Sequence, residues 1–228
     1  MKKLVVLSGA GISADSGLRT FRDSGGLWEG YDVRDVASIE GWKANPALVL
    51  EFYNKRFFQA KEALPNKAHL VLAELETYFD VTIITQNVDD LHEKAGSTKV
   101  LHLHGKLNEC KSERYNNLIY PYPENGLKLG DFCEKGYQLR PNVVWFGEPV
   151  PMYEKALLYA SNADIFLVIG TSLQVYPAAG LIYEVPFNAK KFLLDKKKPE
   201  IELSNFTFIE GSAAETIEIF KHEVMRFR

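Results

Sequence analysis

Short apolar runs separated by longer amphipathic stretches set the pattern of this chain. Residues 4–7 and 165–169 are apolar at every position, which is typical of strands buried on both faces of a parallel sheet. Further strands are expected over residues 81–85, 99–104, 143–148 and 191–194. Apolar residues at helical spacing predict helices over residues 67–79 and 214–227, and another that begins at Asn45-Pro46 and ends at Pro65. This alternation predicts an α/β fold with a Rossmann-like parallel sheet.

The first predicted strand leads into a glycine turn. Gly9, Gly11 and Ala14 match the spacing G-x-G-x-x-G/A, in which small residues allow a tight turn that presents backbone N–H groups to a pyrophosphate. An ordinary strand-to-helix turn is the alternative. The chain lacks the second strand and acidic residue that a dehydrogenase shows about 20 residues further on, and it has no Gly-Lys-Ser/Thr motif for a nucleoside triphosphate. A nucleotide would therefore be held differently than in a dehydrogenase or in a protein that binds a nucleoside triphosphate.

Polar side chains follow two other predicted strands. Gln86, Asn87 and Asp89 come after one of them, at the carboxyl edge where an open α/β sheet places its site. His102 and His104 end the next run, and strand alternation would put both on one face. Such a pair could bind a metal or simply be buried. His104 is the better candidate for general acid/base work, because imidazole titrates near neutral pH.

The predicted helix after Pro46 carries an unusual pair. Tyr53 and Arg56 are three residues apart, so both side chains emerge on one helix face and could grip an anion with a hydroxyl and a guanidinium. An aromatic core residue beside a solvated arginine is the alternative from these two residues alone.

The bulk composition suits a globular enzyme. The chain has 228 residues and a formal net charge of −3, enough length for one domain with a real core and no charge excess that indicates a nucleic-acid or membrane partner. The start does not read as a signal peptide, and no segment approaches the ~20 apolar residues of a membrane span. Two cysteines cannot make a disulfide scaffold. We therefore expect a cytoplasmic protein.

Five motifs in one order resemble the sirtuins, a family of NAD-dependent protein lysine deacylases. They are GAGIS followed by FR, TQN-x-D, LHG-x-L, VVWFGE and GTSL-x-VYPAA, and they extend from Leu4 to Ala179. Tyr53-x-x-Arg56, preceded by Ala37, further resembles the bacterial desuccinylase subgroup, which removes acidic acyl groups such as succinyl and malonyl. The resemblance implies NAD as co-substrate, acylated lysine in proteins or peptides as substrate, and nicotinamide, O-acyl-ADP-ribose and free lysine as products.

The resemblance also implies roles for individual residues. His104 is expected to act as general base on a ribose hydroxyl, and Asn87 and Asp89 to hold that ribose and the nicotinamide amide. The expected cofactor-binding residues are Gly9, Ala10, Gly11, Ile12, Ser13, Thr20, Phe21, Arg22, Trp28, Gln86, Asn87, Val88, Asp89, Gly170, Thr171, Ser172, Asp195 and Ala213. The expected substrate-binding residues are Ala37, Tyr53, Arg56, Val144, Phe146, Gly147 and Glu148. The run 143–148 is expected to pair its backbone with an extended peptide.

Two features of the sequence depart from the family pattern: the number of cysteines and the residue at position 195. Sirtuins usually carry two Cys-x-x-Cys-like pairs that bind a structural zinc, whereas only Cys110 and Cys133 remain here. A four-cysteine site is impossible within one chain, so we expect no zinc; a mixed site completed by His102 or a carboxylate stays open. A small apolar cluster is expected in its place, from Tyr115, Tyr120, Tyr122 and Phe132. Asp195 stands where the family usually has Asn, and an acid can accept from a ribose hydroxyl but cannot donate.

The expected organisation is a single catalytic domain in two parts. A Rossmann-like part would comprise residues 1–22, 67–105 and 141–228, and a small domain would comprise residues 23–66 and 106–140, with the active site between them. The leading functional hypothesis is NAD-dependent removal of acetyl and acidic acyl groups from lysine. Mono-ADP-ribosyl transfer and a non-catalytic NAD-sensing module are the alternatives. The presence of both His104 and the Asn87/Asp89 pair argues against the sensing module, because a sensor needs no positioned base.

Overall fold

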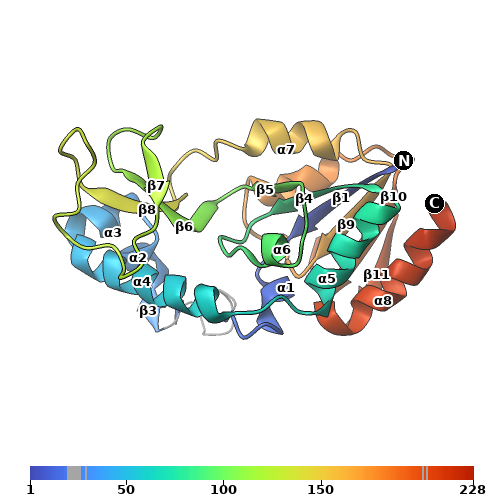
Figure 1. The fold of residues 1–228 in the computed structure, drawn as a ribbon. Helices are drawn as coiled ribbons and strands as arrows, with labels where there is room; N and C mark the ends of the chain where they lie inside the picture. The colour runs from blue at the N-terminus through green and yellow to red at the C-terminus, as the bar shows by residue number, and fades with distance from the viewer. Residues whose placement is uncertain (20–26, 29, 202, 204) are drawn as a thin grey trace.

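The large sheet of the molecule is parallel throughout (Figure 1). The computed structural model describes residues 1–19, 27–28, 30–201, 203 and 205–228. Among these residues, six strands pair in the order β11-β10-β9-β1-β4-β5. The strands are β1 (Lys3–Ser8), β4 (Asp80–Thr85), β5 (Val100–His102), β9 (Ile165–Ile169), β10 (Lys190–Asp195) and β11 (Phe206–Glu210). The strand order reverses between β1 and β9, and open α/β sheets bind ligands at such a switch point. The predicted α/β fold with a Rossmann-like parallel sheet is confirmed.

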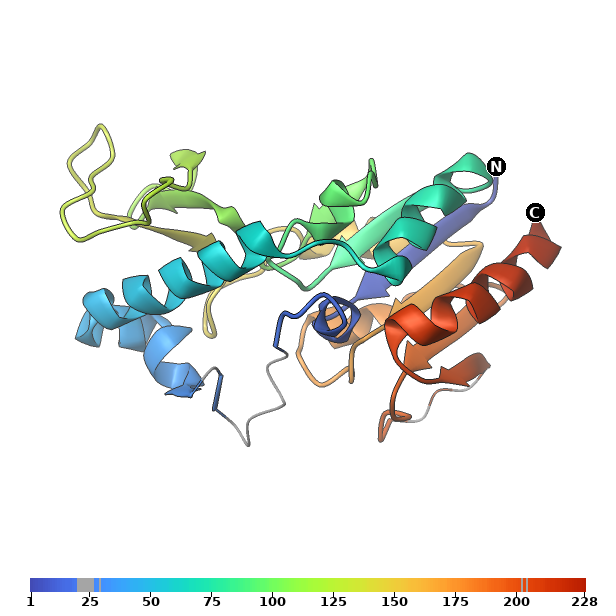
Figure 2. The same cartoon turned by 60° about the horizontal axis from the view of Figure 1, so that its bottom comes forward.

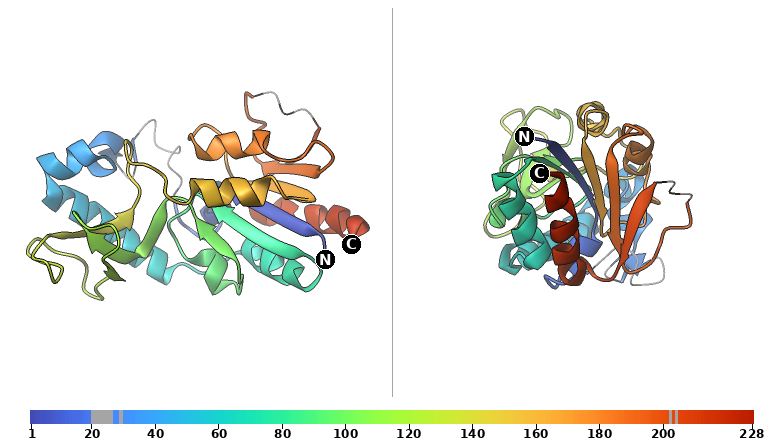
Figure 3. Two further views of the ribbon diagram at one scale, coloured as in Figure 1. Left: turned by 90° about the horizontal axis from the view of Figure 1, so that it is seen from above. Right: turned by 90° about the vertical axis from the view of Figure 1, so that its right-hand side faces the viewer.

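Helices cover both faces of this sheet (Figure 3). The helices α5 (Lys67–Glu74) and α8 (Ala213–Val224) lie side by side on one face (Figure 2), over a core that includes Leu4 and Val6 of β1. The helix α7 (Tyr153–Ala160) and the 3₁₀ helix η2 (Ala178–Tyr183) cover the other face, over a core that includes Val5 and Leu7. Successive residues of a strand point to opposite faces, so a strand buried on both sides is apolar at every position.

A second group of elements lies at the other end of the molecule (Figure 1). Its helices are α2 (Val33–Val36), α3 (Ile39–Ala44) and α4 (Pro46–Glu62). Its strands are β6 (Gly105–Ser112), β7 (Ile119–Pro121) and β8 (Leu139–Val143), which form an antiparallel sheet, and the short pair β2 (Leu27–Trp28) and β3 (Tyr31–Asp32). These elements share a third core, in which Phe52, Tyr53 and Trp145 are almost fully buried. The remaining elements are α1 (Gly11–Ala14), η1 (Leu75–Thr77), α6 (Leu91–Lys94) and η3 (Met225–Phe227).

The predicted elements differ from the observed ones mainly at their ends. The helix expected after Asn45-Pro46 is present, and the Asn45 side chain caps it by accepting from the backbone N–H of Leu48 at 3.1 Å. The strand over residues 165–169 is also confirmed. The helix predicted over residues 67–79 changes to a 3₁₀ turn after Glu74, and the helix predicted to reach residue 227 does the same after Val224.

The strand predicted over residues 143–148 is wrong. β8 ends at Val143, and the chain then turns, because the backbone N–H of Glu148 donates to the carbonyl of Trp145 at 3.0 Å. The Glu148 carboxylate closes the same turn by accepting from the backbone N–H of Trp145 at 2.8 Å. Phe146 keeps one bridge to Ser38. Within this run Val143 and Trp145 are buried, whereas Phe146 is 51% exposed.

The aromatic cluster expected near the cysteines is only partly present. Tyr122 is buried and packs on Phe57, with ring centroids 4.6 Å apart, and Tyr120 packs against the same core. Tyr115 instead meets Tyr137 at the edge of the sheet, and Phe132 is 59% exposed. The inclusion of Phe132 and Tyr115 in one cluster is therefore wrong, because both lie in loops outside the third core.

The amide side chain of Asn54 in α4 holds the loop between β7 and β8 by hydrogen bonds. Asn54 Nδ2 donates to the carbonyl of Leu127 at 2.9 Å, and Oδ1 accepts from the backbone N–H of Leu127 at 2.8 Å and from the Tyr122 hydroxyl at 2.9 Å. Three hydrogen bonds with one amide thus hold a loop whose residues Tyr122 and Leu127 are also buried in the third core. Leu127, which the clamp holds, lies between Cys110 and Cys133 in the sequence.

Replacing Asn54 by alanine is expected to lower the free energy of unfolding by about 1–3 kcal/mol, because the buried polar groups of Leu127 would lose their partners. Urea unfolding of the two proteins measures the difference. Asn116 is the matched control, since its side chain is exposed and its replacement by alanine should change stability by less than about 0.5 kcal/mol. Equal effects of the two substitutions would contradict the clamp.

None of the helices in the described part of the chain is long and apolar enough to cross a membrane.

Candidate functional site

A cavity of about 700 Å³ opens at the carboxyl edge of the large sheet and reaches the second group of elements. Most of the residues predicted to bind cofactor or substrate line it. They are Gly9, Ala10, Gly11, Ser13, Ala37, Tyr53, Arg56, Gln86, Asn87, Val88, Asp89, His104, Val144, Phe146, Gly147, Glu148, Gly170, Thr171, Ser172, Asp195 and Ala213. Ile12 does not line the cavity, because its side chain is fully buried in the core beneath α1. Thr20, Phe21 and Arg22 lie outside the described residues, as does the side chain of Trp28.

Two glycine turns meet at the switch point of the sheet. The backbone N–H of Gly11 donates to the carbonyl of Gly170 at 2.8 Å, and the N–H of Gly9 donates to the carbonyl of Ile169 at 3.1 Å. A Cβ on Gly9 would lie 2.6 Å from the Cβ of Thr171, and one on Gly170 would lie 2.3 Å from the N of Ile12. Gly170 also has φ of +62°, which L side chains rarely adopt. Glycine is therefore required for the two turns to approach one another.

A hydrogen-bond network joins the first turn to the residues after β4. The Ser13 hydroxyl donates to Asp89 Oδ2 at 3.1 Å and accepts from Asn87 Nδ2 at 3.0 Å. Gln86 Nε2 donates to the Thr171 hydroxyl at 3.1 Å, which links β4 to the turn after β9. Burial raises the pKa of Asp89, opposed by hydrogen bonds from Leu91 and Ser13 that lower it. The network holds the amide and carboxylate of this loop in fixed orientations at the cavity wall.

His104 lies half-buried in the same wall. Its Nδ1 is 3.0 Å from the carbonyl oxygen of Gln86, which can only accept, so Nδ1 carries the proton of the neutral ring. Nε2 therefore keeps its lone pair. Burial lowers the pKa of His104, although the bond to Gln86 raises it. The ring is consequently neutral at physiological pH, with Nε2 able to take a proton.

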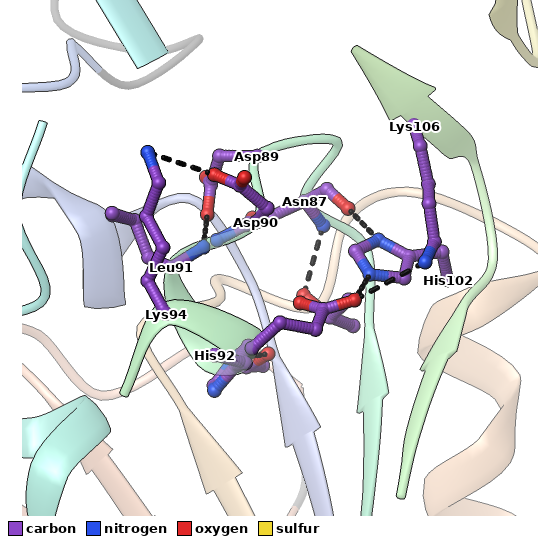
Figure 4. Close-up of polar contacts among 11 residues, drawn as sticks. Asn87, Asp89, Asp90, Leu91, His92, Lys94, His102 and Lys106 are labelled. Atoms are coloured by element: carbon purple, nitrogen blue, oxygen red, sulfur yellow. Dashed lines mark hydrogen bonds and ion pairs between the residues drawn. The ribbon is translucent and has the colours of Figure 1, made fainter. Parts of the chain in front are cut away.

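His102 and His104 do not share a surface, contrary to the prediction from alternation. β5 ends at His102, so the alternation does not extend to His104. His102 is 7% exposed and bonds through both ring nitrogens, to the Asn87 carbonyl at 3.0 Å and to Glu93 Oε1 at 2.8 Å (Figure 4). It is not among the residues that line the cavity.

Tyr53, Arg56 and Ala37 form the end of the cavity inside the second group of elements. Tyr53 is fully buried, and its hydroxyl accepts from the indole Nε1 of Trp145 at 3.0 Å, which leaves its own O–H to donate. Burial raises the pKa of Tyr53 to about 12, although the bond from Trp145 lowers it, so the hydroxyl stays neutral. The Arg56 guanidinium lies over the Phe52 ring, 5.9 Å from its centroid. This end of the cavity therefore combines an apolar wall with the hydroxyl of Tyr53 and the positive charge of Arg56.

The turn after β8 also lines the cavity. The backbone N–H of Val144 donates to the carbonyl of His104, and that of Phe146 to the carbonyl of Ala37, both at 2.9 Å. These two N–H groups are therefore already occupied and are not donors for an extended peptide. The Glu148 side chain is used within the protein, since its two oxygens accept from Arg140 at 2.7 and 2.9 Å. Any contact of Glu148 with a peptide therefore depends on backbone atoms or on partial exchange of this ion pair.

Comparison with known proteins decides the family. The family model described as "Sir2 family" matches residues 9–177, which is more than half of the chain. The chain belongs to the Sir2 family. A "NAD-dependent protein deacylase" of Helicobacter pylori is 52% identical over 96% of this chain and 95% of its own length. One of Bacteroides thetaiotaomicron is 50% identical over 97% of each chain. The solved structure titled "Crystal structure of a Sir2 homolog-NAD complex" has a TM-score of 0.88 and 37% identity, over 99% of this chain and 90% of that one.

The cysteines of this Sir2-family chain are separate thiols. Cys110 Sγ lies 3.6 Å from the Pro121 carbonyl, and Cys133 Sγ lies 3.4 Å from the Ser112 hydroxyl. The ring nitrogens of His102 both have partners elsewhere. Within the described part of the chain, no three His, Cys, Asp or Glu side chains gather as metal ligands would.

The purified protein is expected to contain no stoichiometric zinc, and a strong chelator should leave its Tm unchanged. A closed structural site supplies folding free energy, so its removal would destabilise the segment around Cys110 and Cys133. Elemental analysis and thermal unfolding with and without chelator test this. About one zinc per chain, or a lower Tm in chelator, would contradict it.

Several residues of the Sir2-family cavity were not predicted from the sequence. Arg19 and Gln174 line it, as do Lys196, Lys197 and Lys198 after β10. The three lysines are visible in the sequence as a basic run, but their place at the cavity follows from the strand order. Asp195, which precedes them, accepts from the backbone N–H of Lys197 at 3.3 Å. Its carboxylate thus helps to shape the loop that the lysines occupy.

Proposed function

We propose that this Sir2-family protein removes acetyl and acidic acyl groups, such as succinyl and malonyl, from lysine side chains of proteins, with NAD as co-substrate. The enzyme class is that of its relatives, an NAD-dependent protein deacylase. The observation that carries the proposal is one cavity with glycine turns at one end, His104 in its wall and the Tyr53–Arg56 pair at the other end. We infer that residues 23–66 and 106–140 act as a small domain over the Rossmann-like part, and that the protein works in the cytoplasm, in line with its two free thiols.

The residues at the switch point fit a dinucleotide. The Gly9–Ser13 turn places the start of α1 at the cavity, where a pyrophosphate would lie, while Asn87 and Asp89 face the cavity beside it. When bound, NAD supplies an ADP-ribosyl group whose anomeric carbon can accept the acyl-lysine oxygen after nicotinamide leaves. The Asn87 amide offers both a donor and an acceptor to the ligand, and Asp89 offers acceptors.

His104 supplies the proton transfer. Its Nε2 takes a proton from a ribose hydroxyl, and the Gln86 carbonyl stabilises the positive ring that forms through the bond at 3.0 Å. The turn of residues 144–147 lies beside His104, because the Val144 N–H donates to the His104 carbonyl, so a substrate peptide that binds along this turn would lie near His104. Peptide contact through backbone atoms implies a loose sequence preference.

The acidic-acyl part of the proposal depends on Tyr53 and Arg56. A carboxylate at the end of the acyl chain would accept from the Tyr53 hydroxyl and pair with the guanidinium of Arg56. Ala37 is 3% exposed and lines the cavity, and its small side chain is expected to widen the approach to this pair. The raised pKa of Tyr53 keeps its proton in place as a donor.

Nicotinamide release that depends on acyl-lysine tests the proposed function. The purified protein is incubated with NAD and a peptide carrying succinyl-lysine, acetyl-lysine or unmodified lysine, and nicotinamide and peptide mass are followed. Release and loss of the acyl mass are expected with both acylated peptides. ADP-ribose attached to protein without deacylation would favour mono-ADP-ribosyl transfer instead, and NAD binding without turnover would favour the sensing module.

A further inference from the structure

The cavity continues past the switch point of the sheet, on the side away from His104. There it follows the carboxyl ends of β9, β10 and β11, which lie next to one another in the sheet (Figure 1). Its lining on this side includes Thr171, Asp195 and Gly211, each at the end of one of these strands or within two residues of it. A dinucleotide that spans a switch point places one nucleoside on each side of it. His104 and Asn87 lie on the other side, so this side is left for the adenosine of NAD.

Asp195 is held in the cavity wall through both its backbone and its side chain. It is the last residue of β10, directly after the buried Leu194, and it is only partly exposed. Its backbone carbonyl accepts from the N–H of Gly211 at 3.1 Å, and its carboxylate accepts from the backbone N–H of Lys197 at 3.3 Å. The carboxylate therefore has a defined place beside the adenosine side of the cavity.

A carboxylate in this place distinguishes a ribose from a phosphorylated ribose. A ribose hydroxyl can donate to it, whereas a phosphate on that hydroxyl brings acceptor oxygens and negative charge. Dinucleotide-binding folds that select NAD place an acid on the ribose 2′-hydroxyl, commonly about 20 residues after the glycine turn. Among the described residues, the next strand of the large sheet after β1 is β4, which ends in Thr85. Asp195 supplies an acid from β10, in the other half of the sheet.

The three lysines after Asp195 oppose its effect on a phosphate. Lys196, Lys197 and Lys198 line the same cavity and are exposed, and ammonium groups attract phosphate. Charges in solvent are screened by salt more than partly buried charges are. Two unit charges about 5 Å apart at a protein surface change an equilibrium by roughly 10- to 100-fold. We expect the repulsion by the half-buried carboxylate to outweigh the attraction by the exposed lysines.

We infer that Asp195 selects NAD over NADP, by accepting from the adenosine ribose hydroxyl that carries the extra phosphate in NADP. This inference rests on the proposed function, which places NAD in the cavity. Asp195→Asn keeps an acceptor oxygen for the Lys197 N–H and for the ribose but removes the negative charge. The variant is therefore expected to keep the form of the loop and to admit NADP.

Calorimetric titration with NAD and with NADP tests the inference without relying on turnover. The unsubstituted protein is expected to bind NAD at least about 10-fold more tightly than NADP. Asp195→Asn should bind NADP roughly 10- to 100-fold more tightly than the unsubstituted protein does, and should keep its affinity for NAD within about 10-fold. Equal affinity of the unsubstituted protein for the two dinucleotides, or unchanged NADP affinity in Asp195→Asn, would overturn the inference.

Glu210→Gln is the matched control. Glu210 ends β11 and is paired in register with Asp195, but it is exposed and is not among the residues that line the cavity. The substitution removes the same charge from a neighbouring position, so both affinities should stay within about fivefold of those of the unsubstituted protein. An equal gain of NADP affinity in the two variants would show that net charge decides the choice, and would overturn the role of Asp195.

Added salt gives a second measurement, on the unsubstituted protein. Screening of the Asp195 carboxylate should narrow the gap between the NAD and NADP affinities. A gap that is unchanged or wider in salt would overturn the inference, since the carboxylate would then not set the preference. A protein that shows this preference but does not deacylate would contradict the proposed function alone. A deacylase that uses NADP as well as NAD would contradict the inference alone.

Discussion

Replacing His104 by alanine is expected to lower kcat/KM for deacylation by roughly 10²- to 10⁴-fold, the usual cost of removing a general base. The tautomer of the His104 ring explains why the ring can act as a base. Because Nδ1 donates to the Gln86 carbonyl, Nε2 is free to take the ribose proton, and alanine offers no base at this place. Steady-state kinetics with a succinyl-lysine or acetyl-lysine peptide measure the loss.

NAD binding should survive this substitution, since the imidazole acts after the dinucleotide is bound and the glycine turns do not depend on it. Calorimetric titration with NAD checks that point. His222→Ala is the control, because its side chain is 74% exposed near the end of α8. Near-normal turnover by His104→Ala, or an equal loss in His222→Ala, would contradict the assignment.

Replacing Arg56 by methionine is expected to lower kcat/KM for succinyl-lysine by about 10- to 150-fold and to leave deacetylation within a few fold. A charge-assisted hydrogen bond contributes on the order of 1.5–3 kcal/mol, which corresponds to that range. Acetyl-lysine has no terminal carboxylate and makes no such bond. Methionine keeps much of the length and apolar surface of the arginine stem, although it lacks the guanidinium that lies over the Phe52 ring. Parallel assays of the two peptides measure the ratio.

Lys55→Met is the matched control for Arg56. Lys55 is the neighbouring cation on α4 and pairs with Glu51 at 2.6 Å on the exposed side of the helix. Its loss should change neither activity by more than a few fold. Arg56→Lys should restore succinyl turnover only in part, because lysine lacks the planar fork of arginine. An equal loss of both activities in Arg56→Met would show that the residue supports α4 instead, and the acidic-acyl proposal would fail.

Tyr53 is a less direct test of the same idea. Its hydroxyl accepts from the indole N–H of Trp145 in a fully buried place. Tyr53→Phe would leave that N–H without a partner, at a cost of about 1–3 kcal/mol in stability. A drop in desuccinylation in Tyr53→Phe would therefore combine a lost substrate contact with a loosened core, whereas Arg56→Met separates the two.

The sequence by itself determined the frame of this protein. The runs that became β1 and β9 are apolar at every position, because strands covered on both faces bury every side chain. The glycine spacing after β1 is equally legible, since the turn packs against Gly170 at distances that no Cβ could tolerate. The five ordered motifs identified the family before any contact was known. Buried strands and tight glycine turns can be predicted from the sequence, because each depends on one residue and its near neighbours.

Contacts between distant segments were decided only by the tertiary structure. The run 143–148 has the composition of a strand, but the Glu148 carboxylate and Arg140 fold it into a turn. His102 and His104 look equivalent in sequence, yet β5 ends between them, and one is locked against Glu93 while the other lines the cavity. Hydrophobic periodicity predicts that a side chain is buried, but it does not predict which distant residues it packs against. The choice of partner follows from the order of strands in the sheet and the packing of α4 against β6 and β8.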